Sequence, residues 1–300
     1  MQVDLVDGTY ELFRYHFSPG GGHVNAAGEQ VGATRGVLRS ILTLLENGAT
    51  HVAVATDHVV ESFRNELFDG YKTGEGIDPD LFSQFPLLED ALEAMGVAVL
   101  AMVDVEADDG LASAAAVATA DGRAERIVIR TPDKDLAQCV VDPLVVQYDR
   151  KSDTYRDSAA VVEKYGVEPA SIPDWLALVG DAADGIPGLP GWGAKTTAAV
   201  LRHYRTLDDI PLDHEDWEVE GVRGAARLAA TLKEHVQQAQ LFRTLATVVT
   251  DADVGEVDDW CWTGPTAQLA SWCDRLDAPD VLRRATKLQA ERTAPETPSG

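Results

Sequence analysis

The stretch RIVIRTPDKD, residues 126–135, is an apolar run that ends in a proline and two aspartates. A short run of β-branched residues closed by proline predicts a buried strand. In an open parallel sheet, the carboxyl ends of the strands form the edge where ligands bind. The stretch therefore predicts an α/β fold with Asp133 and Asp135 at that edge.

The same pattern occurs three more times in the first half of the chain: VDLVD at 3–7, HVAVATD at 51–57 and VAVLAMVDVEADD at 97–109. Helical segments alternate with these runs up to about residue 150, as expected for a mostly parallel sheet flanked by helices. From about residue 158 the chain changes to helices and tight turns. We expect one helix after Asp157 through Tyr165, another in IPDWLALVG, a third in AKTTAAVLRHY and further helix within 223–249.

Nine carboxylates follow these runs or a later turn. Any single one could be a turn former or a helix N-cap, and Asp108 or Asp109 could cap the helix LASAAAVATA. Their repetition favours a shared site, whose like charges would repel unless cations were present. Mg²⁺ or Mn²⁺, two ions in number, would suit oxygen ligands and phosphodiester hydrolysis. The set is Asp7, Asp57, Glu106, Asp108, Asp109, Asp133, Asp135, Asp181 and Asp184.

Composition excludes several other classes of protein. The sequence has no run of 18 uncharged apolar residues, and MQVDLVDGTY lacks the basic start of a signal peptide, so we expect a cytoplasmic protein without a membrane partner. Its three cysteines lack CxxC spacing, which argues against a disulfide framework or a zinc site. We expect them to be reduced core residues.

The segment GLPGWGAKT, residues 188–196, resembles a phosphate-binding loop but fails its spacing, because Ala194 separates Gly193 from Lys195 and no strand leads into it. A hairpin between two helices fits better. Gly191 and Gly193 would let the backbone approach a DNA phosphate at the start of the next helix. Such a turn reads the DNA backbone rather than its sequence.

The net charge of −25 makes the chain a poor DNA binder on average. Binding would have to use local basic islands. One is residues 186–205, with three basic residues and no acid, and another is residues 30–45, where Arg35 and Arg39 would share a helical face. Both islands could equally be ordinary solvated surface.

The motifs together resemble the bacterial 5′-3′ exonuclease and flap endonuclease family, typified by the 5′ nuclease domain of DNA polymerase I. The matching stretches are LVDGTYELFR at 5–14, ESFRNELFDGYK at 61–72, VEADDGLASA at 105–114, TPDKDLAQ at 131–138, LALVGDAADGIPGLPGWGAKTTAAVL at 176–201 and LFRTLATVVTD at 241–251.

The resemblance implies three parts. A PIN-like (resolvase-like) nuclease domain would span 1–157, with an arch at about 59–85, and a helix-three-turn-helix DNA-binding domain would span 158–251. A C-terminal extension would span 252–300, where apolar periodicity fades over the last sixteen residues and TAPETPSG is expected to be disordered.

The resemblance also implies roles for the carboxylates. Asp7, Asp57, Glu106 and Asp108 would serve mainly one metal ion. Asp133, Asp135 and Asp181 would serve the other. Asp109 and Asp184 would contact metals or hold their waters, and Lys134 would touch phosphate or neutralise the cluster.

In the arch, the resemblance implies that Arg64 and Lys72 hold the scissile phosphate and that Tyr71 stacks on the terminal base. The hairpin would bind DNA and also a monovalent cation, usually K⁺. Val59, Glu61 and Glu75 depart from the basic residues common in the family, and Gly185 replaces the usual Asn. The DNA-contacting set is Gly188, Gly191, Gly193, Lys195, Thr196, Arg35 and Arg14.

We therefore predict a monomeric, metal-dependent 5′ nuclease that acts on DNA with 5′ ends, flaps or forks, including RNA–DNA hybrids, in replication and repair. Two alternatives stay open: a small ribonuclease of the PIN type, and a non-catalytic paralogue that binds DNA junctions. The acidic arch favours the second, and the complete carboxylate set opposes it.

Overall fold

The structure is a computed structural model that describes residues 1–294. Its centre is a six-stranded sheet in the order β3-β2-β1-β4-β5-β6. The first five strands are parallel and β6 is antiparallel to β5. This confirms the predicted mostly parallel α/β architecture. The strands are β1 (Gln2–Asp7), β2 (His51–Asp57), β3 (Ala98–Met102), β4 (Arg126–Arg130), β5 (Val145–Asp149) and β6 (Thr154–Arg156).

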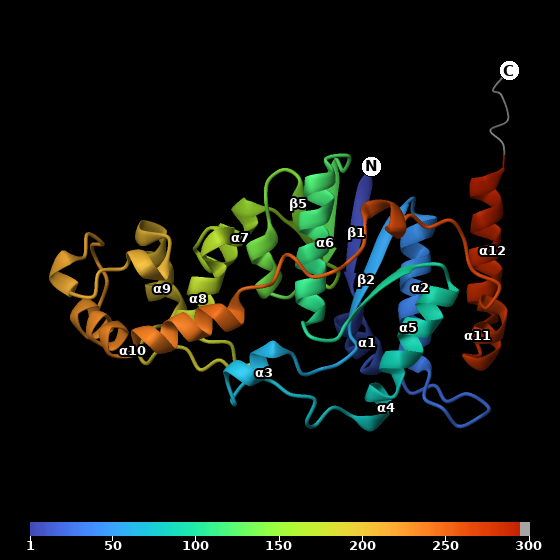
Figure 1. Ribbon diagram of the computed structural model, residues 1–300, viewed down its shortest axis with the longest axis horizontal. Helices are drawn as coiled ribbons and strands as arrows, with labels where there is room; N and C mark the ends of the chain where they lie inside the picture. Colours follow the sequence, from blue (N-terminus) through green and yellow to red (C-terminus); the bar gives the residue numbers. More distant parts are fainter. Residues whose placement is uncertain (295–300) are drawn as a thin grey trace, which may run out of the picture.

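Helices pack on both faces of the sheet (Figure 1). Alternate side chains of a strand point to opposite faces, so Val6 and Val54 join one apolar core while Leu5 and Ala53 join another. The first core is completed by α2 (Gly32–Glu46) and α5 (Gln84–Ala94), with α1 (Gly8–His16) beside them. The second is completed by α6 (Ala107–Asp121). The predicted arch contains two short helices, α3 (Phe63–Leu67) and α4 (Pro79–Phe82).

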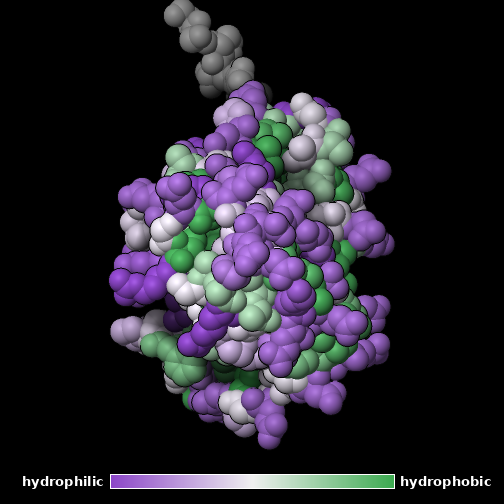
Figure 2. Space-filling model, turned by 90° about the vertical axis from the view of Figure 1, so that its left-hand side faces the viewer, coloured by the Kyte–Doolittle hydropathy of each residue, from purple (hydrophilic) through white to green (hydrophobic). Residues whose placement is uncertain are grey.

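A separate helical region with its own apolar core follows the sheet. The expected helices are present, and Asp157 caps the first by accepting a 2.9 Å hydrogen bond from the Ala160 amide. This region forms one end of the molecule, whose surface is mostly hydrophilic (Figure 2). Its helices are α7 (Ser158–Tyr165), α8 (Ile172–Val179), α9 (Ala194–Tyr204) and α10 (Ala225–Ala246), the last interrupted at His235.

Two C-terminal helices, α11 (Leu269–Arg275) and α12 (Pro279–Thr293), return to the sheet domain and pack beside α2 and α5. The helix α12 continues through Thr293 although apolar periodicity fades from residue 285, because Ala285 and Leu288 are buried in that core. Of the segment TAPETPSG, expected to be disordered, Thr293 ends this helix, and residues 295–300 lie outside the described residues.

The three cysteines are all free, as expected. Cys273 is buried, whereas Cys261 is exposed, so the prediction of core positions is wrong for Cys261. Within residues 1–294, no helix combines the length and the apolar character needed to cross a membrane.

Replacing Leu276 with alanine tests the packing of the C-terminal helices. Leu276 is fully buried between α11 and α12, and a buried Leu→Ala change costs about 2–5 kcal/mol. We expect Leu276→Ala to lower the free energy of unfolding by that amount in urea titrations. Lys287→Ala, on the exposed side of α12, is the control and should change stability by less than about 0.5 kcal/mol. Equal effects in the two variants would contradict this packing.

Candidate metal centre

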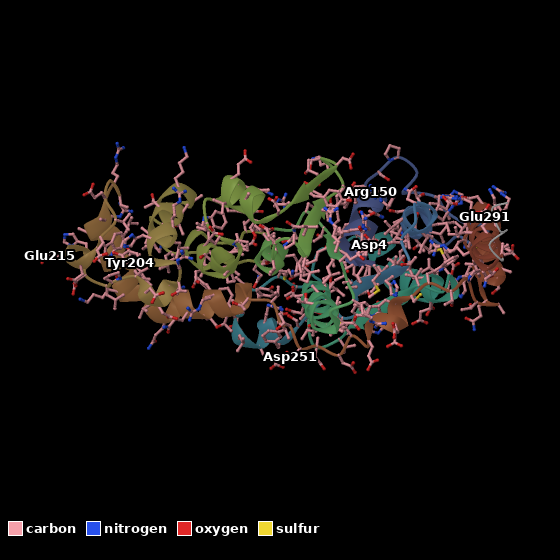
Figure 3. All side chains as sticks on the ribbon, turned by 90° about the horizontal axis from the view of Figure 1, so that it is seen from above. Asp4, Arg150, Tyr204, Glu215, Asp251 and Glu291 are labelled. Atoms are coloured by element: carbon pink, nitrogen blue, oxygen red, sulfur yellow. The ribbon has the colours of Figure 1, made fainter. Side chains whose placement is uncertain are left out.

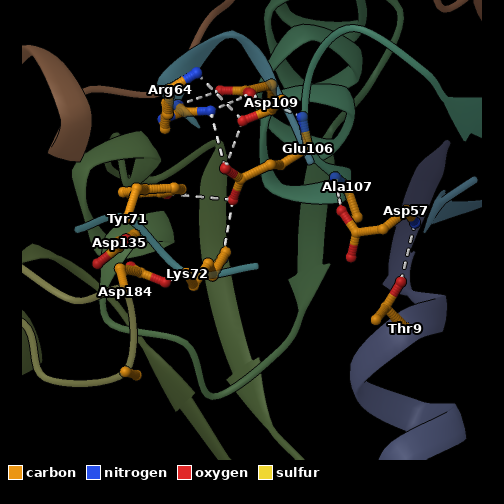
Figure 4. A network of polar contacts seen from close by, with 12 residues as sticks. Thr9, Asp57, Arg64, Tyr71, Lys72, Glu106, Ala107, Asp109, Asp135 and Asp184 are labelled. Carbon is orange, nitrogen blue, oxygen red and sulfur yellow. Dashed lines mark hydrogen bonds and ion pairs between the residues drawn. The ribbon is translucent and has the colours of Figure 1, made fainter. Parts of the chain in front are cut away.

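Two strand-end aspartates of the site also fix the starts of helices. Asp7 ends β1, and its carboxylate accepts a 2.8 Å bond from the Tyr10 amide and another of 2.8 Å from the Thr131 hydroxyl. Asp57 ends β2 and accepts a 2.8 Å bond from the Ala107 amide, while its own amide donates to the Thr9 hydroxyl (Figure 4). Turn-forming and site-forming roles therefore coexist. Neither threonine was predicted, because a threonine near a strand end carries no signal of its own.

The carboxylate oxygens form two groups that share one residue. Asp108, Asp133 and Asp135 each offer an oxygen within 4.8 Å of the others, and so do Asp135, Asp181 and Asp184. Asp135 is buried, and its Oδ1 has no hydrogen-bond partner among residues 1–294. A buried carboxylate oxygen without a donor is unusual, and a cation with oxygen ligands would satisfy it. The donor set thus fits two hard divalent ions on either side of Asp135.

Burial makes several carboxylates of the site difficult to ionise. It raises the pKa of Asp7 to about 7, against the opposing effect of the Tyr10 and Thr131 hydrogen bonds. Burial, with the charge of Asp133, also raises the pKa values of Asp108 and Asp135 well above their usual range. Without added positive charge, burial therefore opposes the ionisation of Asp7, Asp108 and Asp135.

Two lysines supply part of that positive charge. The Lys72 ammonium lies 2.8 Å from Glu106 Oε2 and 2.9 Å from Asp184 Oδ1 (Figure 4). Burial disfavours the charged lysine, but the two carboxylates raise its pKa overall. Burial alone would raise the pKa of Asp184, but the nearby Lys72 ammonium lowers it below its usual value. Lys134 lies 2.5 Å from Asp181 Oδ2. Both lysines bridge the sheet domain and the helical region.

Arg64 and Asp109 do not join the clustered carboxylates, contrary to expectation. The Arg64 guanidinium donates to both Asp109 oxygens at 2.6 and 2.8 Å and to the Leu245 carbonyl at 2.8 Å. Asp109 also accepts from the amides of Glu106 and Val249. Both side chains are buried and saturated, so this pair fastens the arch to the end of α10. The expected cap is also corrected: Glu106, not Asp108 or Asp109, is the N-cap of α6, with Asp109 at its third position.

Tyr71 also differs from the expectation that it stacks on a base. Its side chain is only 5% exposed, packs in the core of the helical region and donates a 3.3 Å hydrogen bond to Glu106. A stacking role needs an exposed ring face. Lys72, by contrast, keeps about a third of its side chain exposed (34%).

The turn between Asp184 and Ile186 has no room for a side chain at Gly185. Its φ of +76° favours glycine, and an added Cβ would lie 2.0 Å from the Gly70 carbonyl oxygen. The turn and the arch therefore touch backbone to backbone, and the Lys72 amide donates to the Asp184 carbonyl at 3.1 Å. The sequence showed the departure from Asn but not this reason.

The remaining predicted residues lie outside the two carboxylate groups. In the hairpin, Gly188 and Gly191 have positive φ, Gly193 is the N-cap of α9, Lys195 is exposed and Thr196 is half-buried.

The predicted basic island on α2 is only partly free. Arg39 pairs with Asp280 of α12 at 2.8 Å. The Arg35 Nε and Nη1 atoms are buried without a hydrogen-bond partner in the described part of the chain. Arg14, on α1, pairs with Glu11 at 2.6 Å.

Solved structures with similar folds support the architecture. The "T5 D15 Protein Co-crystallized with Metal Ions" aligns with a TM-score of 0.64 at 17% identity, over 98% of this chain and all of that one. The "catalytic core of Rad2 in complex with DNA substrate" aligns with a TM-score of 0.58 at 14% identity, over 94% of this chain and 91% of that one. At these identities the similarity shows the fold alone.

Sequence comparisons give the family. DNA polymerase I of Pseudomonas aeruginosa is 35% identical over 98% of this chain, and that of Mycobacterium leprae is 34% identical over 89%. The chain spans about a third of the length of these relatives (33% and 28%). The family model of the 5′-3′ exonuclease N-terminal resolvase-like domain matches residues 2–166, and that of the 5′-3′ exonuclease C-terminal SAM fold matches residues 167–268. The chain therefore belongs to the 5′-3′ exonuclease family.

Proposed function

We propose that this chain is a divalent-metal-dependent 5′-3′ exonuclease and flap endonuclease that hydrolyses DNA phosphodiesters. The observation that carries the proposal is the shared position of Asp135 between two carboxylate groups, with one buried oxygen left without a donor among the described residues. Two ions, Mg²⁺ or Mn²⁺, would supply an activated water and offset the charge of the phosphate.

In this proposal Asp108 and Asp133 hold one ion, Asp181 and Asp184 hold the other, and Asp135 lies between them. This grouping changes the sequence-based division, which placed Asp108 with the strand-end acids. Asp7, Asp57 and Glu106 would surround the first group and hold waters. Lys72 would contact the scissile phosphate, since its ammonium is both partly exposed and adjacent to the carboxylates.

The proposed substrate is DNA with a 5′ end, flap or fork, including RNA–DNA hybrids, handled by a monomer in the cytoplasm during replication and repair. The family supports this choice, as does the similarity in fold to the Rad2 catalytic core, which was solved in complex with a DNA substrate. The exposed Gly191, Gly193 and Lys195 of the hairpin suit backbone contact with a duplex, and K⁺ at this turn is part of the proposal.

One observation favours a second candidate, a non-catalytic binder of DNA junctions. Between Val59 and Phe85 the only basic residues are Arg64 and Lys72, and Arg64 is engaged by Asp109. The arch, all of which the structure describes, therefore offers only Lys72 to a threaded strand.

Incubation of the chain with a 5′-labelled flap, blunt duplex, single-stranded DNA and single-stranded RNA, with Mg²⁺, Mn²⁺ or chelator, separates the candidates. Metal-dependent flap cleavage supports the nuclease. Binding without cleavage supports the junction binder, and RNA-only cleavage would favour a PIN-type ribonuclease.

Asp135→Asn tests the shared ligand. We expect flap cleavage to fall by a factor of about 10³ or more, because a group that acts with others as a unit is lost. The fold should remain, and thermal stability in chelator should be equal or higher, because the amide cannot ionise at a position where burial opposes a charge. The control is Asp104→Asn, an exposed acid that follows β3 outside both groups. Full activity in Asp135→Asn would rule out this ligand assignment.

Lys195→Ala tests the hairpin. We expect weaker binding to duplexes of any sequence. The slope of log K against the logarithm of the salt concentration should become shallower by about 0.9, as for one lost phosphate contact. Binding would be measured by fluorescence anisotropy at several salt concentrations with chelator. Lys287→Ala, an exposed lysine on α12, should leave the slope unchanged. If the salt slope of Lys195→Ala equals that of the parent, the duplex does not contact the hairpin through Lys195.

The raised pKa of Asp7 predicts how pH and metal interact. The folded chain keeps this proton up to about pH 7, whereas the unfolded chain loses it near the ordinary pKa of 3.8. Its contribution to stability is therefore present at low pH and is lost between about pH 4 and 7. Cations would reverse that loss, so Mn²⁺ should raise the melting temperature more at pH 8 than at pH 5. Asp7→Asn should show a smaller difference between the two pH values. An equal gain at both pH values in the parent would contradict this linkage.

A further inference from the structure

One face of the sheet, beside α2, carries polar and aromatic side chains where a parallel sheet usually carries aliphatic ones. Two adjoining hollows on this face share Leu44, Asn47, Arg130 and Tyr148 as lining residues. Tyr155 of β6, in the second hollow, is 47% exposed. The candidate metal centre uses none of these side chains.

Four of these side chains form a continuous stack, here called the arginine–tyrosine ladder: Arg126, Tyr155, Tyr148 and Arg130. The Arg126 guanidinium lies 4.0 Å from the centre of the Tyr155 ring, the Tyr155 and Tyr148 ring centres are 4.9 Å apart, and the Arg130 guanidinium lies 4.9 Å from the Tyr148 ring. Asp4 holds the Arg130 end of the ladder. It is fully buried in β1 and accepts bonds from Arg130 at 2.7 and 2.8 Å.

The first hollow is a cavity of about 180 Å³ with an apolar floor that includes Ile41 and Leu44. Asn47 and Arg150 line its wall, and Arg150 also pairs with Glu11 at 3.2 Å. Thr131 also lines it, and the hydroxyl of Thr131 donates to Asp7. The cavity therefore adjoins the candidate metal centre. In Figure 3, Asp4 and Arg150 lie in the middle part of the molecule, between Glu215 at the helical end and Glu291 on α12.

We propose that the ladder and its cavity bind unpaired nucleotides of a single DNA strand. Aromatic rings stack on bases of any sequence, and a base would replace the Arg126 guanidinium on the exposed Tyr155 ring, which would leave Arg126 to neutralise a phosphate. In a chain of net charge −25, an anionic strand needs local cations. Arg126 forms no ion pair within residues 1–294, so its charge is available. The cavity would take one base over its apolar floor. This site goes beyond the proposed function, since binding there requires no cleavage.

The test uses the full chain in chelator with a twelve-nucleotide oligo-dT, measured by fluorescence anisotropy. Tyr155→Ala should weaken binding about 5- to 150-fold, the range for loss of one stacked base. Tyr155→Phe keeps the ring and should bind as the parent does. Arg126→Ala should also weaken binding, whereas Arg283→Ala, an exposed arginine on α12, should not. Melting curves would confirm that each variant is folded.

Crosslinking places the strand. With bromodeoxyuridine in the oligonucleotide, ultraviolet irradiation should give adducts on Tyr148 or Tyr155, found by mass spectrometry. Unchanged affinity in Tyr155→Ala, or adducts absent from both tyrosines, would overturn the proposal. Flap cleavage by the parent chain with Mg²⁺ is measured in parallel. A chain that cleaves but lacks these adducts loses only this inference, and a chain that shows them without cleaving loses only the proposed nuclease function.

Discussion

The constraint on which the structure depends is the gathering of buried and half-buried carboxylates at one edge of a parallel sheet. Strand ends deliver Asp7 and Asp57 there, and the loop after β4 delivers Asp133 and Asp135. Burial and the charges of neighbouring acids raise the pKa values of Asp7, Asp57 and Asp135. A fold that keeps such a cluster must provide compensating donors and cations, and much of the surrounding architecture can be understood as that compensation.

The compensation comes from both parts of the molecule. Backbone amides at the starts of α1 and α6 donate to Asp7 and Asp57. The two lysines cross between the parts, because Lys72 of the arch and Lys134 of the sheet domain both pair with acids of the turn before Gly188. The acidic edge is thus also the contact between the two parts. Cations that bind there would stabilise the same contact, so ligand binding and domain packing are coupled.

The sequence predicted the sheet and the acidic edge because strand patterns and turn residues are local signals. It could not separate Asp109 from Asp108, or assign Arg64, because their roles depend on contacts with Leu245 and Val249 far along the chain. The last helix was missed for a different reason: only a few buried side chains, among them Ala285 and Leu288, anchor it within a polar segment. The domain boundaries after 157 and 251 stay predictions, although α11 and α12 share the core of the first part.

The arginines show why composition is a poor guide to nucleic-acid binding in this chain. Several positive charges are already neutralised internally: Arg64 by Asp109, Arg39 by Asp280 and Arg14 by Glu11. A basic side chain in an ion pair releases few counterions when DNA binds. Among the local features left for a polyanion are the hairpin at Lys195, the stacked Arg126 and Lys72, which stays partly exposed although it pairs with Glu106 and Asp184. Because each feature lies on a different element, the path of the DNA would be set by the relative placement of these elements rather than by a continuous basic surface.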